Sequence, residues 1–503
     1  MKSSILFAAL LFALPALAMT PERYGLRTFR NSIVQSNGSA STGRLLSNSV
    51  IDQKVDSLNG GIWLATGNGI NFWHIVDSMI TSIPSGEKIG RGGVSALVPF
   101  HDTLWAATAY DENIDGTVYP AGGGIGWSYD GGETWRWQPQ PVDSRDCTSY
   151  SPTTTNIQNL TYDLSVSSNA IWAASFGGGL RKGTLHRDTI SSAPLVVRDS
   201  VHWRARPPDN NPFSALAYLN HRAFSVLAEN DSVIWCGTAG GVNRSEDGGE
   251  TWANFSYSPT DSFSLAGNFV VSLHLQRHAN GTKTLWASTW KAEGASEEYG
   301  LTYTNDDGRT WHRTLIGEKI HNVTSDSIAV YAVGSNGLFK SIDGGETWGQ
   351  FPAIRDANGR ERFVEQELYS VASAFNRFTI GGPDGWATSR DGGGNWSIGR
   401  SYIPTTDPGQ PAVYAYPNPY SPERFGAVRF QYFLPHSGEV SLTLYNFAME
   451  KAGTILKKAS RAQGDNTEIW NGRFDNATLA NGVYFYKLEK PGGVAWGKLI
   501  VLD

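Results

Sequence analysis

Short apolar runs alternate with polar turns along most of the chain, and one order of four runs recurs. The clearest copy begins with "AFSVLAE" from Ala223, continues with "IWCGT" from Ile234 and "GGVNRSE" from Gly240, and ends with a run opened by Trp252. Short runs of apolar and aromatic residues, bounded by Gly, Asn and Asp, are typical of β-strands joined by turns. The pattern therefore predicts units of four antiparallel strands.

Seven copies of the second run mark seven such units. This tryptophan motif reads "IWLAT" at Ile62 and "LWAAT" at Leu104, and its central residues are Trp63, Trp105, Trp172, Trp235, Trp286, Tyr331 and Thr379. The spacing averages near the roughly 40–50 residues of one propeller blade. Seven four-stranded units that close into a ring form a β-propeller. A two-layer sandwich is the alternative, but it predicts no fixed four-strand period.

A second motif, Ser/Thr-x-Asp-x-Gly-x-Thr/Asn-Trp, lies between the third and fourth predicted strands of five units. Its acidic residues are Asp130, Asp247, Asp306, Asp343 and Asp391. An Asp carboxylate can accept hydrogen bonds from the amides of a turn, and Gly allows a positive φ. The Trp then packs against a neighbouring sheet. We therefore interpret these five aspartates, called the aspartate motif below, as structural rather than catalytic.

The aspartate motif resembles the Asp-box (BNR) repeat of sialidases, sortilin-type receptors, xyloglucan-cleaving glycosidases and seven-bladed photosystem assembly factors. The stretch "IWLATGNGINFW" from Ile62 also looks like the propellers of hybrid two-component sensors. Together these resemblances cover about residues 47–401 and imply a propeller. Since one fold hosts many functions, they imply no single activity.

The pattern changes after the last repeat, which places the propeller at residues 47–402. A Pro/Thr/Gly linker spans 403–412, and alternating apolar residues in 413–503 predict six or seven strands of a small Ig-like β-sandwich. Residues 413–503 resemble the Ig-like domain of flagellar hook-capping proteins and the sorting tail of bacterial type IX secretion substrates. The motifs on which this resemblance rests are "YPNP" from Tyr416, "WNG" from Trp470, "NGVYFY" from Asn481 and "KLIVL" from Lys498.

That resemblance implies that 413–503 serves export or surface attachment through secretion or cell-surface machinery. A plain structural appendage is the alternative.

At the other terminus, Lys2 precedes an apolar run, Ile5 to Leu14, and a small-x-small site ends at Ala18. This is typical of a secretory signal at 1–18, and the run is short for a membrane span. We expect a secreted or cell-surface protein without a membrane span after cleavage, and an N-terminal extension over 19–46.

Charge and cysteine content limit the classes of partner and ligand that the chain can bind. The 503 residues carry a net charge of -6, and no basic run occurs, which argues against nucleic-acid binding. The two cysteines, Cys147 and Cys236, form no CxxC pair or Cys/His cluster that would favour zinc. Cys236 lies in an apolar run and fits a buried small hydrophobe. A disulfide between the two stays open in an exported protein.

Long insertions indicate where a ligand would bind. They fall between second and third strands, at 109–124 and 289–300, and between units, at 138–156, 204–222 and 354–367. Both kinds of connection emerge on one face of an up-and-down blade, and functional residues concentrate on such loops. We expect a glycan or protein ligand there, held by Tyr119, Trp290 and Lys291. The alternative for Trp290 is that its ring only fills the core.

The segment "DENIDG" from Asp111 suggests a site for one cofactor, a calcium ion. Asp111, Asn113 and Asp115 match the first oxygen ligands of a calcium loop, but Gly122 stands where the bidentate Glu should be. An Asx-rich surface loop is the alternative. No other cofactor is predicted.

No catalytic residues are predicted. A sialidase would need an arginine cluster, a Tyr nucleophile and an Arg-Ile-Pro signature, and the chain offers only "TFRNS" from Thr28. The sequence favours a binding protein. It leaves open a glycoside hydrolase or lyase that uses carboxylates of the loop-rich face on an extracellular polysaccharide.

Overall fold

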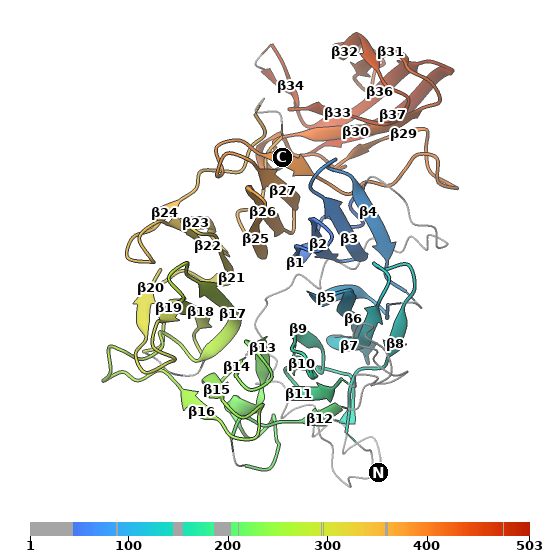
Figure 1. The fold of residues 1–503 in the computed structure, drawn as a ribbon. Coiled ribbons are helices and arrows are strands. Elements are labelled where there is room, and N and C mark those ends of the chain that lie inside the picture. The colour runs from blue at the N-terminus through green and yellow to red at the C-terminus, as the bar shows by residue number, and fades with distance from the viewer. Residues whose placement is uncertain are drawn as a thin grey trace. The chain divides into compact units, whose positions relative to one another are not determined.

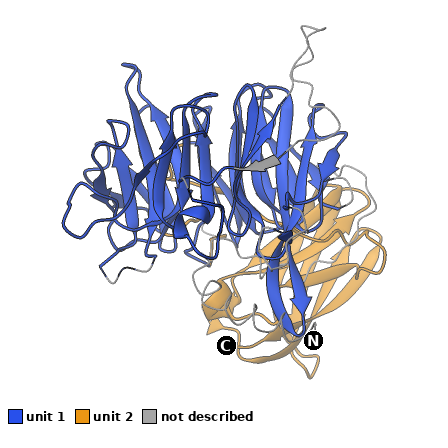
Figure 2. Ribbon diagram, turned by 90° about the horizontal axis from the view of Figure 1, so that it is seen from below, with its two compact units in different colours: residues 1–352, 365–390 blue, residues 353–364, 391–503 orange. Residues whose placement is uncertain are grey.

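The computed structural model describes residues 44–86, 89–143, 154–185, 203–209, 211–292, 294, 296–357, 361–475 and 477–503. The predicted signal sequence, most of the N-terminal extension and Cys147 lie outside these residues. The chain divides into two compact units, residues 1–352 with 365–390, and residues 353–364 with 391–503 (Figure 2). No helix in the described part is long and apolar enough to cross a membrane.

Seven four-stranded antiparallel sheets follow one another along the described chain, each in simple meander order. The first three are β1 (Val50–Asp56), β2 (Gly61–Thr66), β3 (Gly69–His74) and β4 (Ile80–Pro84); β5 (Gly93–Phe100), β6 (Thr103–Ile114), β7 (Thr117–Ser128) and β8 (Arg136–Gln138); and β9 (Thr161–Val166), β10 (Ala170–Ser175), β11 (Gly179–Thr184) and β12 (Trp203–Ala205).

A short 3-10 helix, η3 (Leu219–His221), precedes the fourth sheet. The remaining sheets are β13 (Ala223–Ala228), β14 (Ile234–Thr238), β15 (Gly241–Ser245) and β16 (Ala253–Phe255); β17 (Phe269–Arg277), β18 (Lys283–Trp290), β19 (Gly300–Thr304) and β20 (His312–Thr314); β21 (Ile320–Ser325), β22 (Val330–Gly334), β23 (Gly337–Ser341) and β24 (Gly349–Gln350); and β25 (Ser370–Ala374), β26 (Arg377–Gly382), β27 (Gly385–Ser389) and β28 (Ser397–Gly399).

The first strand of every sheet lies innermost and contacts the first strand of the next sheet (Figure 1). Contacts between β25 and β1 complete the circuit, so the sheets are the blades of a closed ring. The predicted all-β, seven-bladed propeller is confirmed. Blades one and three have the same four strands although they lack the aspartate motif.

The tryptophan motif lies on the second strand and fills the space between blades. Trp235 and Trp286 are buried, and Trp235 packs with residues of blade five. Each indole N–H donates to a polar group near the end of the first strand, Trp235 to Glu229 at 2.6 Å and Trp286 to Gln276 at 3.0 Å. The large apolar surface of each indole is thus buried, while its one polar atom, the ring nitrogen, keeps a hydrogen-bond partner.

Side chains of blades one and seven close the ring. Gln53 donates to the carbonyl oxygen of Ser370 at 3.2 Å and to its hydroxyl at 3.0 Å. The indole of Trp386 donates to the Gln53 amide oxygen at 3.2 Å and packs edge-on against Trp73. This group of four side chains, called the seam below, joins residues more than 300 positions apart.

The second unit contains a small β-sandwich, as the sequence predicts. One sheet is β29 (Val413–Tyr416), β30 (Val428–Leu434) and β33 (Gly464–Trp470). The other, in the order β32-β31-β36-β37, contains β31 (Gly438–Tyr445), β32 (Lys451–Arg461), β36 (Gly482–Lys490) and β37 (Gly493–Val501). A hairpin, β34 (Arg473–Phe474) with β35 (Ala477–Thr478), and a one-turn helix, α2 (Pro422–Phe425), complete it. Alternate residues such as Leu442, Tyr486 and Leu499 meet in one core.

Residues before 403 also belong to this unit. Its members at 353–364 include Glu361, which accepts a hydrogen bond from Arg429 on β30 at 2.7 Å and lies 3.8 Å from Arg400. The link at 354–367, expected on the loop-rich face, therefore contributes most of its length to the second unit.

Candidate functional site

Two faces of the propeller differ in what they carry. Turns between second and third strands and links between blades lie on one face, called the loop face below. The aspartate motifs and the turns between first and second strands lie on the opposite face. This follows from the meander order of each blade. The loop face therefore carries the insertions at 109–124, 204–222 and 289–300.

The insertion of blade two is a regular hairpin. Its strands β6 and β7 stay paired out to Ile114 and Thr117, and Asp115 and Gly116 turn the chain with positive φ. Asp111 and Asn113 belong to β6 rather than to a loop, and the Asn113 side chain accepts a hydrogen bond from the Gly116 amide at 2.9 Å. That contact is typical of an Asx turn. Calcium binding by Asp111, Asn113 and Asp115 stays a prediction.

The predicted ligand-binding rings lie inside the protein. Tyr119 is 4% exposed and Trp290 is 3% exposed, whereas Lys291 is exposed. The Trp290 indole donates to the carbonyl oxygen of Ile320 at 2.6 Å, and its ring packs with Phe224 and Phe269. This geometry favours the core-filling alternative for Trp290, since a ligand in solution would not reach either ring face.

A repeated β-bulge builds the core around the axis. In the described blades one to six, the first strand bulges near its start, and the extra residues are Ile51, Ser95, Tyr162, Phe224, Val271 and His321. A bulge re-aims its side chain. Four of these side chains, all apolar, join Trp290 in one buried cluster on the axis. His321 takes this position in blade six, where a buried imidazole replaces an apolar group.

His321 connects this core to a polar cluster on the loop face. The ring is 0% exposed, and its Nε2 lies 3.3 Å from the Glu367 carboxylate and 3.3 Å from the Ser335 hydroxyl. The Glu367 side chain is 36% exposed, and the Tyr369 hydroxyl lies 3.5 Å from it. Lys319 places its ammonium 4.4 Å above the Trp290 ring. We call Lys319, His321, Glu367 and Tyr369 the rim cluster.

The rim cluster is suited to binding. The hydrogen bond from His321 lowers the pKa of Glu367 below its usual range, and the charge of Lys319 adds to this effect. A carboxylate with a lowered pKa stays ionised at neutral pH and is a weak general acid or base. An ionised carboxylate beside an ammonium group offers an acceptor and donors to hydroxyl or amide groups of a ligand. Sequence reasoning did not select any of these four residues.

The insertion of blade five is ordered by a buried acid. Glu297 is almost fully buried and accepts hydrogen bonds from the backbone amides of Ala292, Gly294 and Asn268, at 2.7, 3.3 and 3.0 Å. Its carboxylate therefore holds the loop together and is not presented to solvent. Lys291 lies at the start of this loop.

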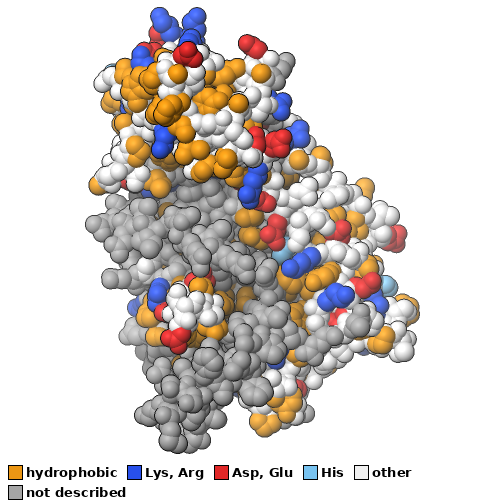
Figure 3. Space-filling view, turned by 180° about the vertical axis from the view of Figure 1, so that it is seen from behind, with side chains coloured by type: hydrophobic (Ala, Val, Ile, Leu, Met, Phe, Trp, Pro, Cys, Tyr) orange, Lys and Arg blue, Asp and Glu red, His pale blue; other side chains and the backbone are white. Residues whose placement is uncertain are grey.

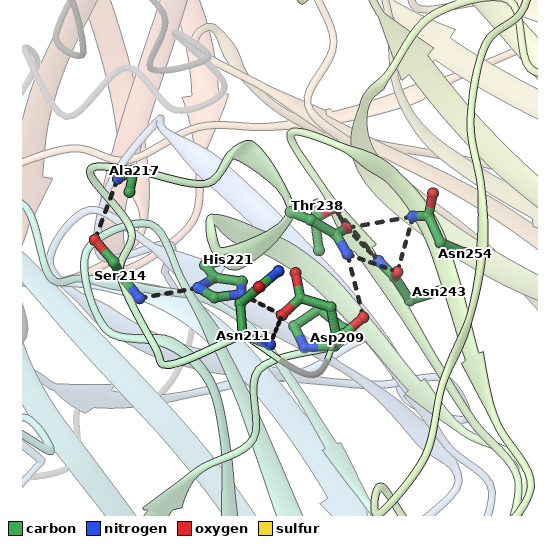
Figure 4. Close-up of polar contacts among 10 residues, drawn as sticks. Asp209, Asn211, Ser214, Ala217, His221, Thr238, Asn243 and Asn254 are labelled. Carbon is green, nitrogen blue, oxygen red and sulfur yellow. Dashed lines mark hydrogen bonds and ion pairs between the residues drawn. The ribbon is translucent and has the colours of Figure 1, made fainter.

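The link before blade four brings together Asp209, Ser214 and His221 (Figure 4). The set has the residue types of a catalytic triad but not its connections. The backbone N–H of Ser214 donates to His221 Nδ1 at 2.9 Å, and His221 Nε2 lies 2.8 Å from Asp209. The Ser214 hydroxyl accepts from the Ala217 amide instead. Both ring nitrogens are engaged in holding the link, and the serine is not activated.

The aspartate motif forms a self-contained turn. In blade four, the Asp247 carboxylate accepts hydrogen bonds from the amide and hydroxyl of Thr251 at 2.8 and 2.5 Å and from Ser245 at 2.8 Å. The bonds from Thr251 are the main cause of the lowered pKa of Asp247. Asp130, Asp306, Asp343 and Asp391 make the corresponding bonds to the Thr or Asn four positions on. These contacts favour the structural interpretation.

Cys236 is buried and free among the described residues, and burial raises the pKa of its thiol. Its pairing with Cys147 stays untested, because Cys147 lies outside the described residues.

Comparisons with known proteins identify no family for the chain. No family model matches the chain, and no curated protein matches it. The chain is similar to the β-propeller domain of Cps50 (Swd1) from Myceliophteria thermophila, with 10% identity over 71% of this chain and 98% of that one, at a TM-score of 0.42. It is also similar to the extracellular domain of the putative hybrid two component system BT3049 from B. thetaiotaomicron, with 12% identity over 90% and 72%, at a TM-score of 0.26. The chain is a β-propeller protein on the evidence of its own seven sheets.

Proposed function

We propose that this protein is an exported β-propeller that binds an extracellular glycan or a surface protein at its loop face, without chemistry on the ligand. The rim cluster supports the proposal. It places an ionised carboxylate and an ammonium group on the links before blades seven and six, with the buried Tyr369 hydroxyl 3.5 Å from the carboxylate. Groups of this kind orient a bound ligand through hydrogen bonds and charge.

A glycoside hydrolase or lyase is the alternative that the sequence left open. Hydrolysis needs two carboxyl groups about 5 Å apart for retention or about 6.5–9.5 Å apart for inversion, one of them with a raised pKa. The rim cluster as described contains one carboxyl group, that of Glu367, and its pKa is lowered. Binding therefore accounts for the cluster better than hydrolysis does.

The test compares two matched variants of the full-length protein on a panel of polysaccharides and surface-protein extracts. Glu367→Gln removes the charge at nearly constant shape, and Glu346→Gln makes the same change in an exposed residue of an aspartate motif on the opposite face. We expect Glu367→Gln alone to weaken retention by about tenfold or more, the loss typical of a residue central to an interface. Equal retention of both variants, or release of reducing ends by the parent protein, would contradict the proposal.

Export and attachment form the second half of the proposal. The resemblance of 413–503 to sorting tails and the predicted secretory signal at 1–18 support it. N-terminal sequencing of the mature protein should start at Met19, and protease treatment of intact cells should degrade the protein. An intact Met1 together with protection from protease would refute this half.

A further inference from the structure

The second unit carries an unusual surface on its four-stranded sheet. Residues Val440, Leu442 and Leu444 of β31 face the core, so the alternate residues face outward. Across the sheet, the register places Lys451, Tyr445, Phe485 and Lys498 side by side in one outward row. Trp496 lies in the adjacent row, opposite Lys487.

Aromatic rings gather on this outward side. Tyr445 and Trp496 have ring centroids 5.5 Å apart, and Phe447 and Phe485 have centroids 6.3 Å apart. Phe447 is 76% exposed and Trp496 is 48% exposed. Hydrophobic side chains, with basic ones among them, are also visible on the second unit in Figure 3. We call Tyr445, Phe447, Phe485 and Trp496 the aromatic face.

An aromatic face open to solvent needs an explanation. The solvent side of an antiparallel sheet is usually polar, and grouped apolar residues in contact with water mark interaction sites more often than scattered ones do. Packing of the two sheets against each other does not require these rings. The core between the sheets is formed by side chains on the opposite side of the same strands.

The charge around the aromatic face restricts the partner. Residues 438–461 and 482–501 hold seven basic and three acidic side chains in a chain whose net charge is -6, and one of the seven, Arg461, pairs with Glu468 of the other sheet. Lys487 is paired with Glu489 at 2.6 Å. Lys451 and Lys498, which flank the two rings of the outward row, have no acidic side chain within ion-pair distance among the described residues.

We propose that the aromatic face binds an acidic polysaccharide, whose sugar rings stack on Tyr445 and Trp496 and whose anionic groups pair with Lys451 and Lys498. Sugar rings present flat C–H faces to aromatic side chains, and their charged groups stay at the edge, where the two lysines lie. A second copy of this chain fits less well, because a two-fold contact would bring the lysines of both copies together. A protein partner would be expected to insert anchors into pockets, whereas this surface offers exposed aromatic side chains. The proposal is independent of the function proposed for the loop face.

The test uses full-length protein and three immobilised acidic polysaccharides, namely polygalacturonate, alginate and hyaluronan. A neutral glucan and poly-L-glutamate serve as controls for stacking without charge and for charge without sugar. We expect binding to at least one acidic polysaccharide that weakens with salt, and at least tenfold weaker binding to both controls. Absence of binding to all three, or equal binding to poly-L-glutamate, would overturn the proposal. A concentration-dependent dimer lost in Trp496→Ala would assign the face to self-association instead.

Variants separate the contribution of stacking from that of charge. Trp496→Ala should reduce affinity at least tenfold, and the double variant Lys451→Gln/Lys498→Gln should reduce both the affinity and its dependence on salt. Phe447→Ala covers the case in which Trp496→Ala lowers stability, because the Phe447 ring is mostly in solvent and its removal leaves the core intact. Glu346→Gln, at an exposed residue outside both surfaces, should bind the acidic polysaccharide like the parent. Unchanged affinity in folded Phe447→Ala and in the lysine variant would refute the assignment, whatever the result at the loop face.

Discussion

Replacing Trp290 by alanine distinguishes a core residue from a ligand anchor. The indole is 3% exposed, donates to the Ile320 carbonyl oxygen at 2.6 Å and lies with nine other buried side chains in the axial cluster. Removal of a fully buried Trp costs about 3–5 kcal/mol of unfolding free energy, from lost burial and the remaining cavity. Trp290→Phe keeps most of the ring and loses the donor, at a cost of about 1 kcal/mol.

Calorimetry of the propeller transition measures both changes. At about 2 °C per kcal/mol for a large domain, we expect Trp290→Ala to melt roughly 6–10 °C lower and Trp290→Phe about 2 °C lower. Lys291→Gln, at the exposed neighbouring residue, is the matched control and should melt like the parent. Melting of Trp290→Ala within about 1 °C of the parent, together with a tenfold loss of ligand retention, would refute the core assignment and restore Trp290 as an anchor.

Four further changes test other parts of the structure. Asp306→Ala should lower the free energy of unfolding by about 1–2 kcal/mol, because the turn loses several hydrogen bonds to one carboxylate, while ligand retention stays unchanged. Burial, with the nearby charge of Lys54, lowers the pKa of His274 from 6.5 to about 4, so the unfolded chain binds a proton that the folded chain does not between these values. Stability should therefore fall as the pH drops from 6.5 to 4, by up to about 3 kcal/mol, and urea titrations at pH 7 and 4.5 should show a smaller fall in His274→Gln. A chain ending at residue 405 lacks Arg429, the partner of Glu361. Limited proteolysis should then cut the link near Glu361 while the blades resist, whereas cleavage throughout the chain would contradict independent folding of the propeller. If the blade-two hairpin binds calcium, calorimetric titration of the parent protein with calcium should give a heat of binding that Asp111→Asn abolishes. A titration of the parent without heat would refute the site.

The fold was predictable because its signals are local and repeated. A turn such as the one around Asp247 closes its own hydrogen bonds within seven residues, so each copy in the sequence reports the same structure. The seam could not be predicted in this way. Gln53 and Ser370 are 317 positions apart, and their contact depends on the number and curvature of all the blades between them.

The candidate site was predicted less well, for two physical reasons. Loop length pointed to Tyr119, but the insertion extends strands β6 and β7, and alternation along a strand turns every second side chain away from solvent. His321 and Glu367 lie in an ordinary strand and an ordinary link. The available signal was a histidine at a strand position that holds Ile51 or Phe224 in sister blades, and it becomes visible only when the first strands are aligned on their bulges.

The seam has a consequence for how this architecture can change in evolution. Each described blade consists of one continuous stretch of chain, and no blade is completed by a strand from the other terminus. Duplication or deletion of about 45 consecutive codons would thus add or remove a whole blade without splitting one. Every interface between neighbouring blades would then have to adapt to the new curvature, and the contact between Gln53, Ser370 and Trp386 would have to form again across the changed ring. A ring with a changed number of blades would therefore close only if the contacts of the seam could still form.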